Sequence, residues 1–367
     1  MLSRFECENF RGFKKRLVFD LTARTYEFNS GLIKNGTVKN CLVFGRNGSG
    51  KSSLGVAIFD IVRHLTDNRA IDLKLMAPYT NLDNSEKVAS FKYVFKFAEG
   101  VVTYQYEKLG PDQLVHESLW FGATLVIDWN YSNGEGNFYD EKTLGSVSLE
   151  KRGVGVSVVK YIYRTQKSES HVLLVRFVKF IESMLWYRRL SSGPTYAGFQ
   201  MKAESTGEAI IQQGKLREFE EFLRDHGLNY ELYSERVDGR DVLMVRYAHG
   251  SARFASVASS GTLCLELFFY WSIAAFASVS LLFIDEYDAY VHFESSKALL
   301  ERLNQSQAFQ VFLTTHNTYL MQNALTRPDA CYILGDNRIV KLCEATDKEI
   351  RLAHNLEKMY THGVFCV

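Results

Sequence analysis

Apolar and polar residues follow two different periods along this chain, and the change between them outlines its elements. Up to residue 106, short runs alternate between apolar and polar positions, a pattern that predicts β-strands. One stretch of helical period interrupts these strands. The expected strands are residues 5–10, 17–21, 38–44, 91–97 and 101–106. The expected helix begins near Lys51 and shows its apolar period over Leu54–Leu65.

From residue 258 onward, helical stretches and short apolar runs take turns. Helices are expected at 261–277 and 293–303, and strands at 281–284 and 310–315. Buried apolar strands that are separated by helices are typical of a mostly parallel α/β sheet.

The stretch between these two parts has a different character. It combines short strands rich in aromatic residues with a helix at 172–187, a loop containing Gly and Ser at 191–208, and a helix at 214–225. Strand patterns resume at 230–236 and 242–247. We therefore expect one α/β domain formed by residues 1–108 and 228–367, with residues 109–227 as an inserted α+β segment.

The most specific motif follows the apolar run Cys41–Phe44 and precedes the helix at Leu54–Leu65. It is a complete GxxxxGK[ST] loop with one further serine: Gly45, Arg46, Asn47, Gly48, Ser49, Gly50, Lys51, Ser52 and Ser53. Such a loop turns successive backbone N–H groups toward phosphate oxygens. We expect Lys51 to reach the β- and γ-phosphates and the Ser52 hydroxyl to bind Mg²⁺.

Two further strands end in residues that suit phosphate chemistry. Asp285 and Glu286 follow the strand at 281–284, and His316 follows the strand at 310–315. Side chains at the carboxyl ends of parallel strands meet at one edge of the sheet. We expect Asp285 to hold Mg²⁺, Glu286 to polarise the attacking water, and His316 to contact the γ-phosphate. The alternatives are ordinary solvent-facing acids and an incidental histidine.

A run of small hydroxyl residues opens the helix expected at 261–277. Ser259, Ser260, Gly261 and Thr262 are typical of a helix N-cap, and the same geometry offers N–H groups to an anion. The two roles are compatible, so these residues remain candidates for nucleotide binding.

Composition narrows the class of protein. The net charge of +1 over 367 residues gives no overall electrostatic footprint for nucleic acid. The basic clusters at 14–16 and 188–189 are small enough to be solvated faces. The six cysteines include no CxxC pair, and no apolar window is long enough to span a membrane. We expect a cytoplasmic protein without a membrane partner.

The order of these motifs resembles that of the ABC-type ATPase heads: P-loop, serine-glycine signature, acidic strand, switch histidine. The stretch Asn9–Phe13, which reads NFRGF, is similar to the opening of the chromosome-maintenance and repair branch. The resemblance implies an ABC-type P-loop NTPase head, with a mostly parallel sheet and an antiparallel β subdomain. It also implies ATP and Mg²⁺ as cofactors. Each ATP would lie between Lys51 of one subunit and Ser259–Thr262 of another, in a head-to-tail dimer.

Further details resemble the ATPases related to the OLD nucleases, including subunits of the anti-phage systems Septu, PARIS and retron-linked modules. These details are the SSGT signature, Asp285–Asp288 with Val291-His292, and the C-terminal stretch Asn355–Tyr360 with Gly363. The resemblance covers 1–107 and 229–367. It implies an ATP-hydrolysing sensor or scaffold subunit, in a homodimer or higher homo-oligomer, that controls a separate effector such as a nuclease or toxin encoded nearby.

Several points stay open at this level. OLD nucleases carry a C-terminal Toprim domain, and too few residues follow His316 to form one, so any nuclease activity is expected in a partner. The alternative function is a DNA repair or recombination ATPase like the RecF family, which binds DNA. Arg11 either contacts the nucleotide or forms a salt bridge at a strand edge. His292 either lies at the dimer seam or caps its helix.

Overall fold

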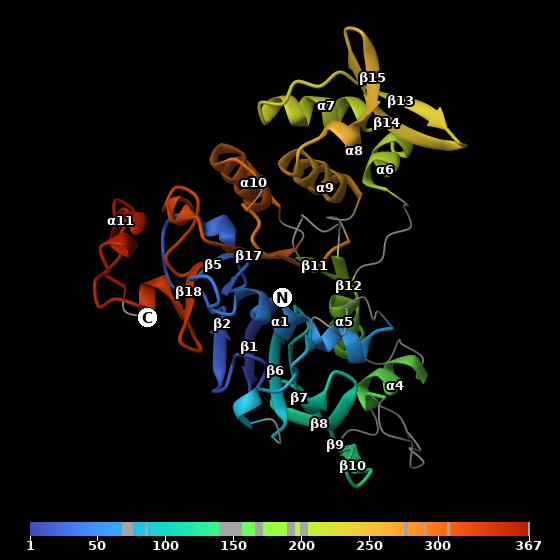
Figure 1. The fold of residues 1–367 in the computed structure, drawn as a ribbon. Helices are drawn as coiled ribbons and strands as arrows, with labels where there is room; N and C mark the ends of the chain where they lie inside the picture. The colour runs from blue at the N-terminus through green and yellow to red at the C-terminus, as the bar shows by residue number, and fades with distance from the viewer. Residues whose placement is uncertain are drawn as a thin grey trace.

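Two seven-stranded sheets dominate the protein (Figure 1). The structure is a computed structural model, and it describes residues 1–67, 76–84, 87–138, 156–165, 172–188, 195–198, 205–274, 278–289, 291–306 and 309–365. One sheet is mostly parallel and the other is antiparallel. Together they give the mixed α/β architecture of a P-loop NTPase that the sequence predicts.

The parallel sheet has the strand order β12-β11-β16-β17-β5-β18-β19. Its five inner strands are mutually parallel, and the two edge strands pair antiparallel. The strands are β5 (Asn40–Phe44), β11 (Met184–Arg188), β12 (Thr195–Gly198), β16 (Leu281–Ile284), β17 (Gln310–Thr315), β18 (Cys331–Gly335) and β19 (Arg338–Lys341). Because β5 lies between β17 and β18, the loop after β5 has the β16–β17 pair on one side and the β18–β19 hairpin on the other.

Helices cover both faces of this sheet. Alternate residues of a strand point to opposite faces, and here they enter two separate cores. Val43 and Phe283 share one core with helix α1 (Lys51–Leu65), whereas Leu42 and Ile284 share the other with α9 (Ser260–Ala274) and α10 (Phe293–Gln305). Helix α1 therefore packs on the face opposite to α9 and α10.

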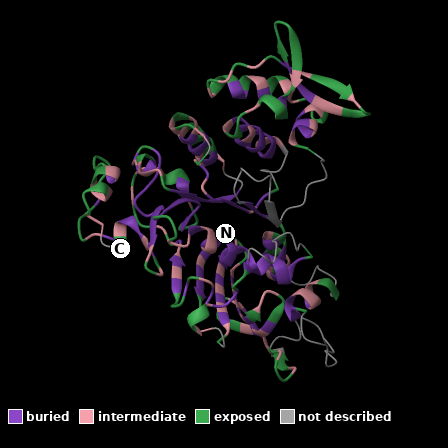
Figure 2. Ribbon diagram, viewed as in Figure 1, coloured by how far each residue is buried: buried purple, intermediate pink, exposed green. Residues whose placement is uncertain are grey.

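The antiparallel sheet lies against the other side of α1, so that this helix is sandwiched between the two sheets (Figures 1 and 2). Its strand order is β10-β9-β8-β7-β6-β1-β2. The strands are β1 (Leu2–Glu8), β2 (Leu17–Asp20), β6 (Ala89–Lys96), β7 (Val101–Gly110), β8 (Gln113–Phe121), β9 (Thr124–Asn130) and β10 (Glu135–Phe138). Helices α4 (Val158–Thr165) and α5 (Val172–Glu182) pack beside it.

A buried polar cluster joins α1 to this sheet. The carboxylate of Asp60 on α1 accepts hydrogen bonds from the Lys108 ammonium at 2.7 Å, the Tyr106 hydroxyl at 2.9 Å and the Tyr79 hydroxyl at 3.0 Å. Asp60 and Lys108 are fully buried. A buried charge requires such partners, so the cluster fixes the position of the helix that begins at the P-loop.

A third unit stands beyond α9 (Figure 1). It contains α6 (Thr206–Gln212), α7 (Leu216–Asp225), the three-stranded sheet β13 (Leu232–Val237), β14 (Arg240–Tyr247) and β15 (Gly250–Arg253), and the short α8 (Phe254–Val257). Elsewhere β3 (Ile33–Lys34) pairs with β4 (Thr37–Val38), and α11 (Leu356–Thr361) lies near the other end of the parallel sheet.

The structure differs from the expected segment 109–227. Strand β7 runs through the boundary at 108, and β8 to β10 continue the N-terminal sheet because each pairs with the strand before it. The helix expected at 172–187 ends at Glu182, and Met184–Arg188 forms β11, which pairs with β16 in the parallel sheet. Residues 109–227 are therefore distributed over three parts of the fold. The loop expected at 191–208 contains β12 and the start of α6 among its described residues, and the end of the helix expected at 261–277 lies outside the described residues beyond Ala274.

Candidate nucleotide site

The GxxxxGK[ST] loop connects β5 to α1 at the carboxyl edge of the parallel sheet. Gly48 and Gly50 have φ values of 78° and 101°, which side chains rarely adopt, so glycine is required at both positions. A Cβ atom on Gly50 would lie 3.0 Å from the Phe13 ring, and one on Gly45 would lie 2.6 Å from the Leu334 carbonyl oxygen. The loop is thus pressed closely between the β1–β2 loop and β18.

Lys51 begins α1, and its ammonium group lies inside the loop. It donates to the carbonyl oxygens of Gly45 at 2.9 Å and Arg46 at 3.1 Å, and the residue is 5% exposed. Burial lowers the pKa of Lys51, and the negative charges of Asp285, Glu286 and Asp288 oppose that shift. The lysine and the acidic residues therefore form one electrostatic unit, as the positions of their strands predict.

Asp285 and Glu286 follow β16 directly, and Thr314 of the neighbouring strand β17 holds both. Its hydroxyl donates to Asp285 Oδ1 at 2.6 Å and accepts the backbone N–H of Glu286 at 2.8 Å. Asp285 is buried, and Glu286 is half-buried with a φ of 48°. Holding a non-glycine residue in the left-handed region costs about 1–3 kcal/mol, and residues strained in this way cluster at functional sites. Thr314 is not among the site residues predicted from the sequence.

His316 comes directly after β17 and is exposed. It lies near Asp288: burial raises the pKa of the Asp288 carboxyl, and a hydrogen bond with Thr315 and the charge of His316 act against that rise. The structure therefore brings together Lys51, Asp285, Glu286 and His316 at one edge of the sheet.

The run Ser259–Thr262 lies elsewhere. The Ser259 hydroxyl accepts the N–H of Thr262 at 3.2 Å and lies 2.9 Å from the Thr262 hydroxyl, so it caps α9. Ser259 and Ser260 are exposed, and α9 packs on the sheet face opposite to α1. None of the four residues lines the cavity at the P-loop of the same chain.

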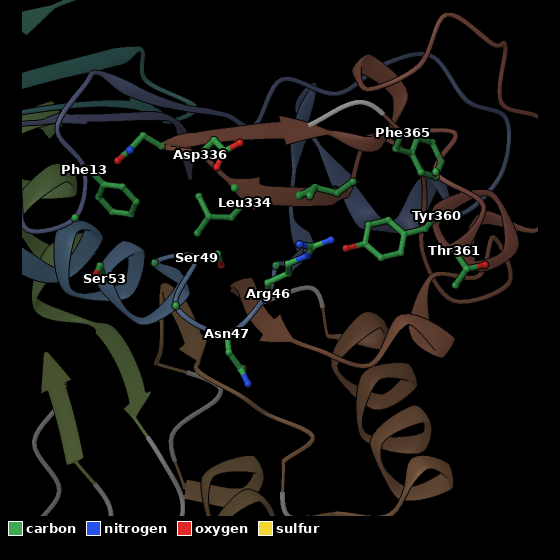
Figure 3. A pocket seen from close by; sticks show the side chains of 18 residues that line it. Phe13, Arg46, Asn47, Ser49, Ser53, Leu334, Asp336, Tyr360, Thr361 and Phe365 are labelled. Atoms are coloured by element: carbon green, nitrogen blue, oxygen red, sulfur yellow. The ribbon is translucent and has the colours of Figure 1, made fainter.

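That cavity has a volume of about 910 Å³, within the range of pockets that hold a whole small ligand. The P-loop forms its floor (Figure 3). Besides the P-loop and residues 12 and 13, its described walls are the β18–β19 hairpin and a segment that sequence reasoning did not assign to the site: Tyr360, Thr361, Gly363 and Phe365. No local pattern connects these residues with a P-loop about three hundred positions earlier.

The oxygen-bearing side chains at the P-loop and after β16 suit the way in which Mg²⁺ binds together with a nucleotide. Among the described residues no group of three or more His, Cys, Asp or Glu side chains could hold a metal by itself. Magnesium at nucleotide sites commonly has only one or two protein ligands, with phosphates and water completing its shell. The Ser52 hydroxyl and the buried Asp285 carboxylate are oxygen ligands of the kind that Mg²⁺ prefers.

The sequence leaves the roles of Arg11 and His292 open, and the structure shows where each residue lies. Arg11 occupies a tight turn with a φ of 51°, and its backbone bonds to Tyr79 and Asn81. Its neighbours Gly12 and Phe13, not Arg11, line the cavity. His292 occupies the N-cap position of α10, but its side chain makes no capping hydrogen bond and is exposed.

Comparison with known proteins adds family information for the second half of this site. Residues 187–322 match the family model described as "AAA domain, putative AbiEii toxin, Type IV TA system", which is less than half of the chain. The match includes Asp285, Glu286 and His316. Over this stretch the chain resembles an AAA-type P-loop ATPase domain. No curated protein matched the chain.

Solved structures of SMC head domains are similar over most of the chain. The SMC head domain from Thermotoga maritima is 14% identical, with 93% of this chain and 98% of that chain covered and a TM-score of 0.40. An SMC head bound to the C-winged helix domain of ScpA is 15% identical, with 92% and 96% covered and a TM-score of 0.44. In the described part of the chain no helix has both the length and the apolar character needed to cross a membrane.

Proposed function

We propose that this protein binds and hydrolyses ATP. The observation that carries the proposal is the meeting of three strand ends at one sheet edge. They place the P-loop lysine near the Asp285-Glu286 pair, and His316 near Asp288, which follows the same pair. Catalysis of phosphoryl transfer depends mainly on positioning and on charge stabilisation, and this arrangement supplies both.

Each residue has a role that follows from its position. The P-loop N–H groups and Lys51 bind the phosphates, and Glu286 orients and polarises the attacking water. His316 stabilises the γ-phosphate from the next strand. Ser52 and Asp285 hold Mg²⁺, which neutralises phosphate charge when it is bound.

We propose further that the site is completed by a second copy of the chain. Ser259–Thr262 form a capped helix start in which Ser259 and Ser260 are exposed, and none of the four residues lines the P-loop cavity of the same chain. The free N–H groups of such a helix start attract anions. In a head-to-tail dimer, each helix start would meet the nucleotide of the opposite subunit, and ATP binding would control assembly.

For the biological role we propose a sensor or scaffold subunit of a bacterial defence complex, which controls a separate effector protein. The toxin–antitoxin description of the matching family supports this role. It is favoured over DNA binding because two of the basic residues at 14–16 are already paired: Lys14 with Asp83 and Arg16 with Glu6.

The direct test of the enzyme activity is phosphate release from ATP by the purified protein. The Lys51→Ala variant serves as the negative control and Lys348→Ala, outside the site, as the matched one. Turnover that survives Lys51→Ala would refute the assignment. The defence role is tested by co-purification with the product of the adjacent gene and by phage restriction with and without that gene.

A further inference from the structure

The cavity at the P-loop extends from the loop to the β18 side of β5 and, among the residues that the structure describes, not to the β17 side. The strand order places β16 and β17, with Glu286 and His316, on one side of β5, and the β18–β19 hairpin on the other. Apart from the P-loop and residues 12 and 13, the described cavity walls all lie on the β18 side. If the proposed ATPase function holds, the γ-phosphate points toward Glu286 and His316. The ribose and base of the nucleotide must then lie over β18 and the C-terminal segment 356–365.

The far wall on that side is aromatic. Two rings from the segment 356–365, which we call the tail, line it: Tyr360 from α11 and Phe365 after the helix. Both are half-buried against the core that contains Leu356. The side chain of Arg46 extends from the P-loop toward Tyr360 (Figure 3). Two aromatic faces and a guanidinium plane form the kind of surface on which a nucleobase stacks.

The tail is held in place by specific bonds. The buried amide of Asn323 donates from Nδ2 to three carbonyl oxygens just before the tail, those of Arg351, Leu352 and His354, at 3.0, 3.1 and 3.1 Å. Asn355 then caps α11 by accepting the N–H of Lys358 at 2.8 Å. After the helix, Gly363 takes a φ of 68°, and the N–H of Val364 returns to the Met359 carbonyl at 3.0 Å. These hydrogen bonds fix the tail, and with it Tyr360 and Phe365, in position beside the cavity.

From these observations we propose that the tail forms the base subsite of the nucleotide pocket. Tyr360 and Phe365 contact the nucleobase of a bound nucleoside triphosphate, and Asn323 is a positioning residue that acts through the tail. The P-loop binds the phosphates without reading the base, so selection of a nucleotide over a bare polyphosphate comes from the tail.

Calorimetric titration of the full chain with ATP and with inorganic tripolyphosphate tests this inference. Tyr360→Ala should weaken ATP binding roughly tenfold or more, because stacking of one base on an aromatic ring is worth about that factor. Binding of tripolyphosphate should not change. Tyr360→Phe keeps the ring and should bind ATP as the wild type does. Tyr247→Ala, an exposed tyrosine on β14 outside the cavity, is the matched control.

Phe365→Ala should likewise weaken the binding of ATP and leave the binding of tripolyphosphate unchanged. The test therefore stands even if Tyr360→Ala fails to fold. Asn323→Leu should lower the preference for ATP over tripolyphosphate, a change that a purely structural role would not cause. Equal ATP affinity in Tyr360→Ala, Phe365→Ala and the wild type would overturn the base subsite and leave the ATPase proposal intact. A wild-type protein that binds neither ligand would overturn both.

Discussion

Thr314 offers the sharpest test of how the acidic strand is organised. Its hydroxyl bonds to both residues of the Asp285-Glu286 pair, as donor to the first and acceptor from the second. Thr314 and Asp285 are buried, so water cannot replace the bond between them. Thr314→Val keeps the shape of the side chain and removes both.

The magnitude follows from the two bonds. A hydrogen bond to a charged group contributes about 1.5–3 kcal/mol, and a buried donor without a partner costs about 1–3 kcal/mol. The N–H of Glu286 is only partly buried, so we expect Thr314→Val to lower the free energy of unfolding by ~2–4 kcal/mol. Thr314→Ser keeps the hydroxyl and loses one methyl group, which costs only about 1 kcal/mol.

Two measurements on the Val and Ser variants check this reasoning. The urea midpoint of unfolding should fall more for Thr314→Val than for Thr314→Ser. ATP turnover should fall at least about tenfold in Thr314→Val. A shift of the Asp285-Glu286 pair that raises the activation free energy by only about 1.4 kcal/mol has that effect. If the Val variant is as stable and as active as the Ser variant, Thr314 does not hold the acidic pair in the way described.

Three further predictions concern Glu286, the start of α9 and the buried acid Glu266 within α9. Glu286→Gln should keep ATP binding and slow hydrolysis by roughly 10²–10⁴, the usual contribution of a positioned base; unchanged turnover would remove Glu286 from that role. Ser259→Arg should abolish turnover while ATP still binds to the single chain, whereas Ser132→Arg in an exposed turn should be silent; an active Ser259→Arg variant would exclude the composite site. Burial raises the pKa of Glu266 to about 7, so the folded state keeps a proton that the unfolded chain releases above about pH 4.5. The stability that this proton contributes is complete below about pH 4.5 and is lost as the pH rises through about 7. Glu266→Gln should therefore flatten the decline in that window and raise stability at pH 8 by ~3 kcal/mol, as measured by urea unfolding at several pH values; an unchanged pH profile would contradict the assignment.

The sequence predicted the strands of the site more accurately than any other part of the fold. The strands at 281–284 and 310–315 begin and end at the expected residues. Each contains a short apolar run, Leu281–Ile284 in one and Val311–Leu313 in the other, and each is buried along its whole length and followed by polar residues, so local composition marks it. The helix after the P-loop was expected to begin near Lys51, and it spans Lys51–Leu65, because the motif marks its first turn and the apolar period marks the rest.

What the sequence could not predict depends on pairing between distant segments. Met184–Arg188 continues the apolar character of α5, and only its pairing with β16 makes it a strand. The bonds of Thr314 join neighbouring strands whose contact is not visible in either one. The position of Tyr360 and Phe365 beside the P-loop likewise results from the packing of α11 and from the contacts of Asn323. For each of these, a local pattern leaves several arrangements open.

The central claim, a nucleotide site shared between two copies of the chain, can be tested by mixing two inactive variants. Lys51→Ala removes the phosphate-binding half of a site, and Ser259→Arg removes the helix-start half. In a head-to-tail dimer of one variant with the other, one of the two sites contains both intact halves. With random pairing, the mixture should recover about a quarter of the wild-type ATPase activity, although each variant alone is inactive. No recovery in mixtures that demonstrably exchange subunits would contradict the shared site.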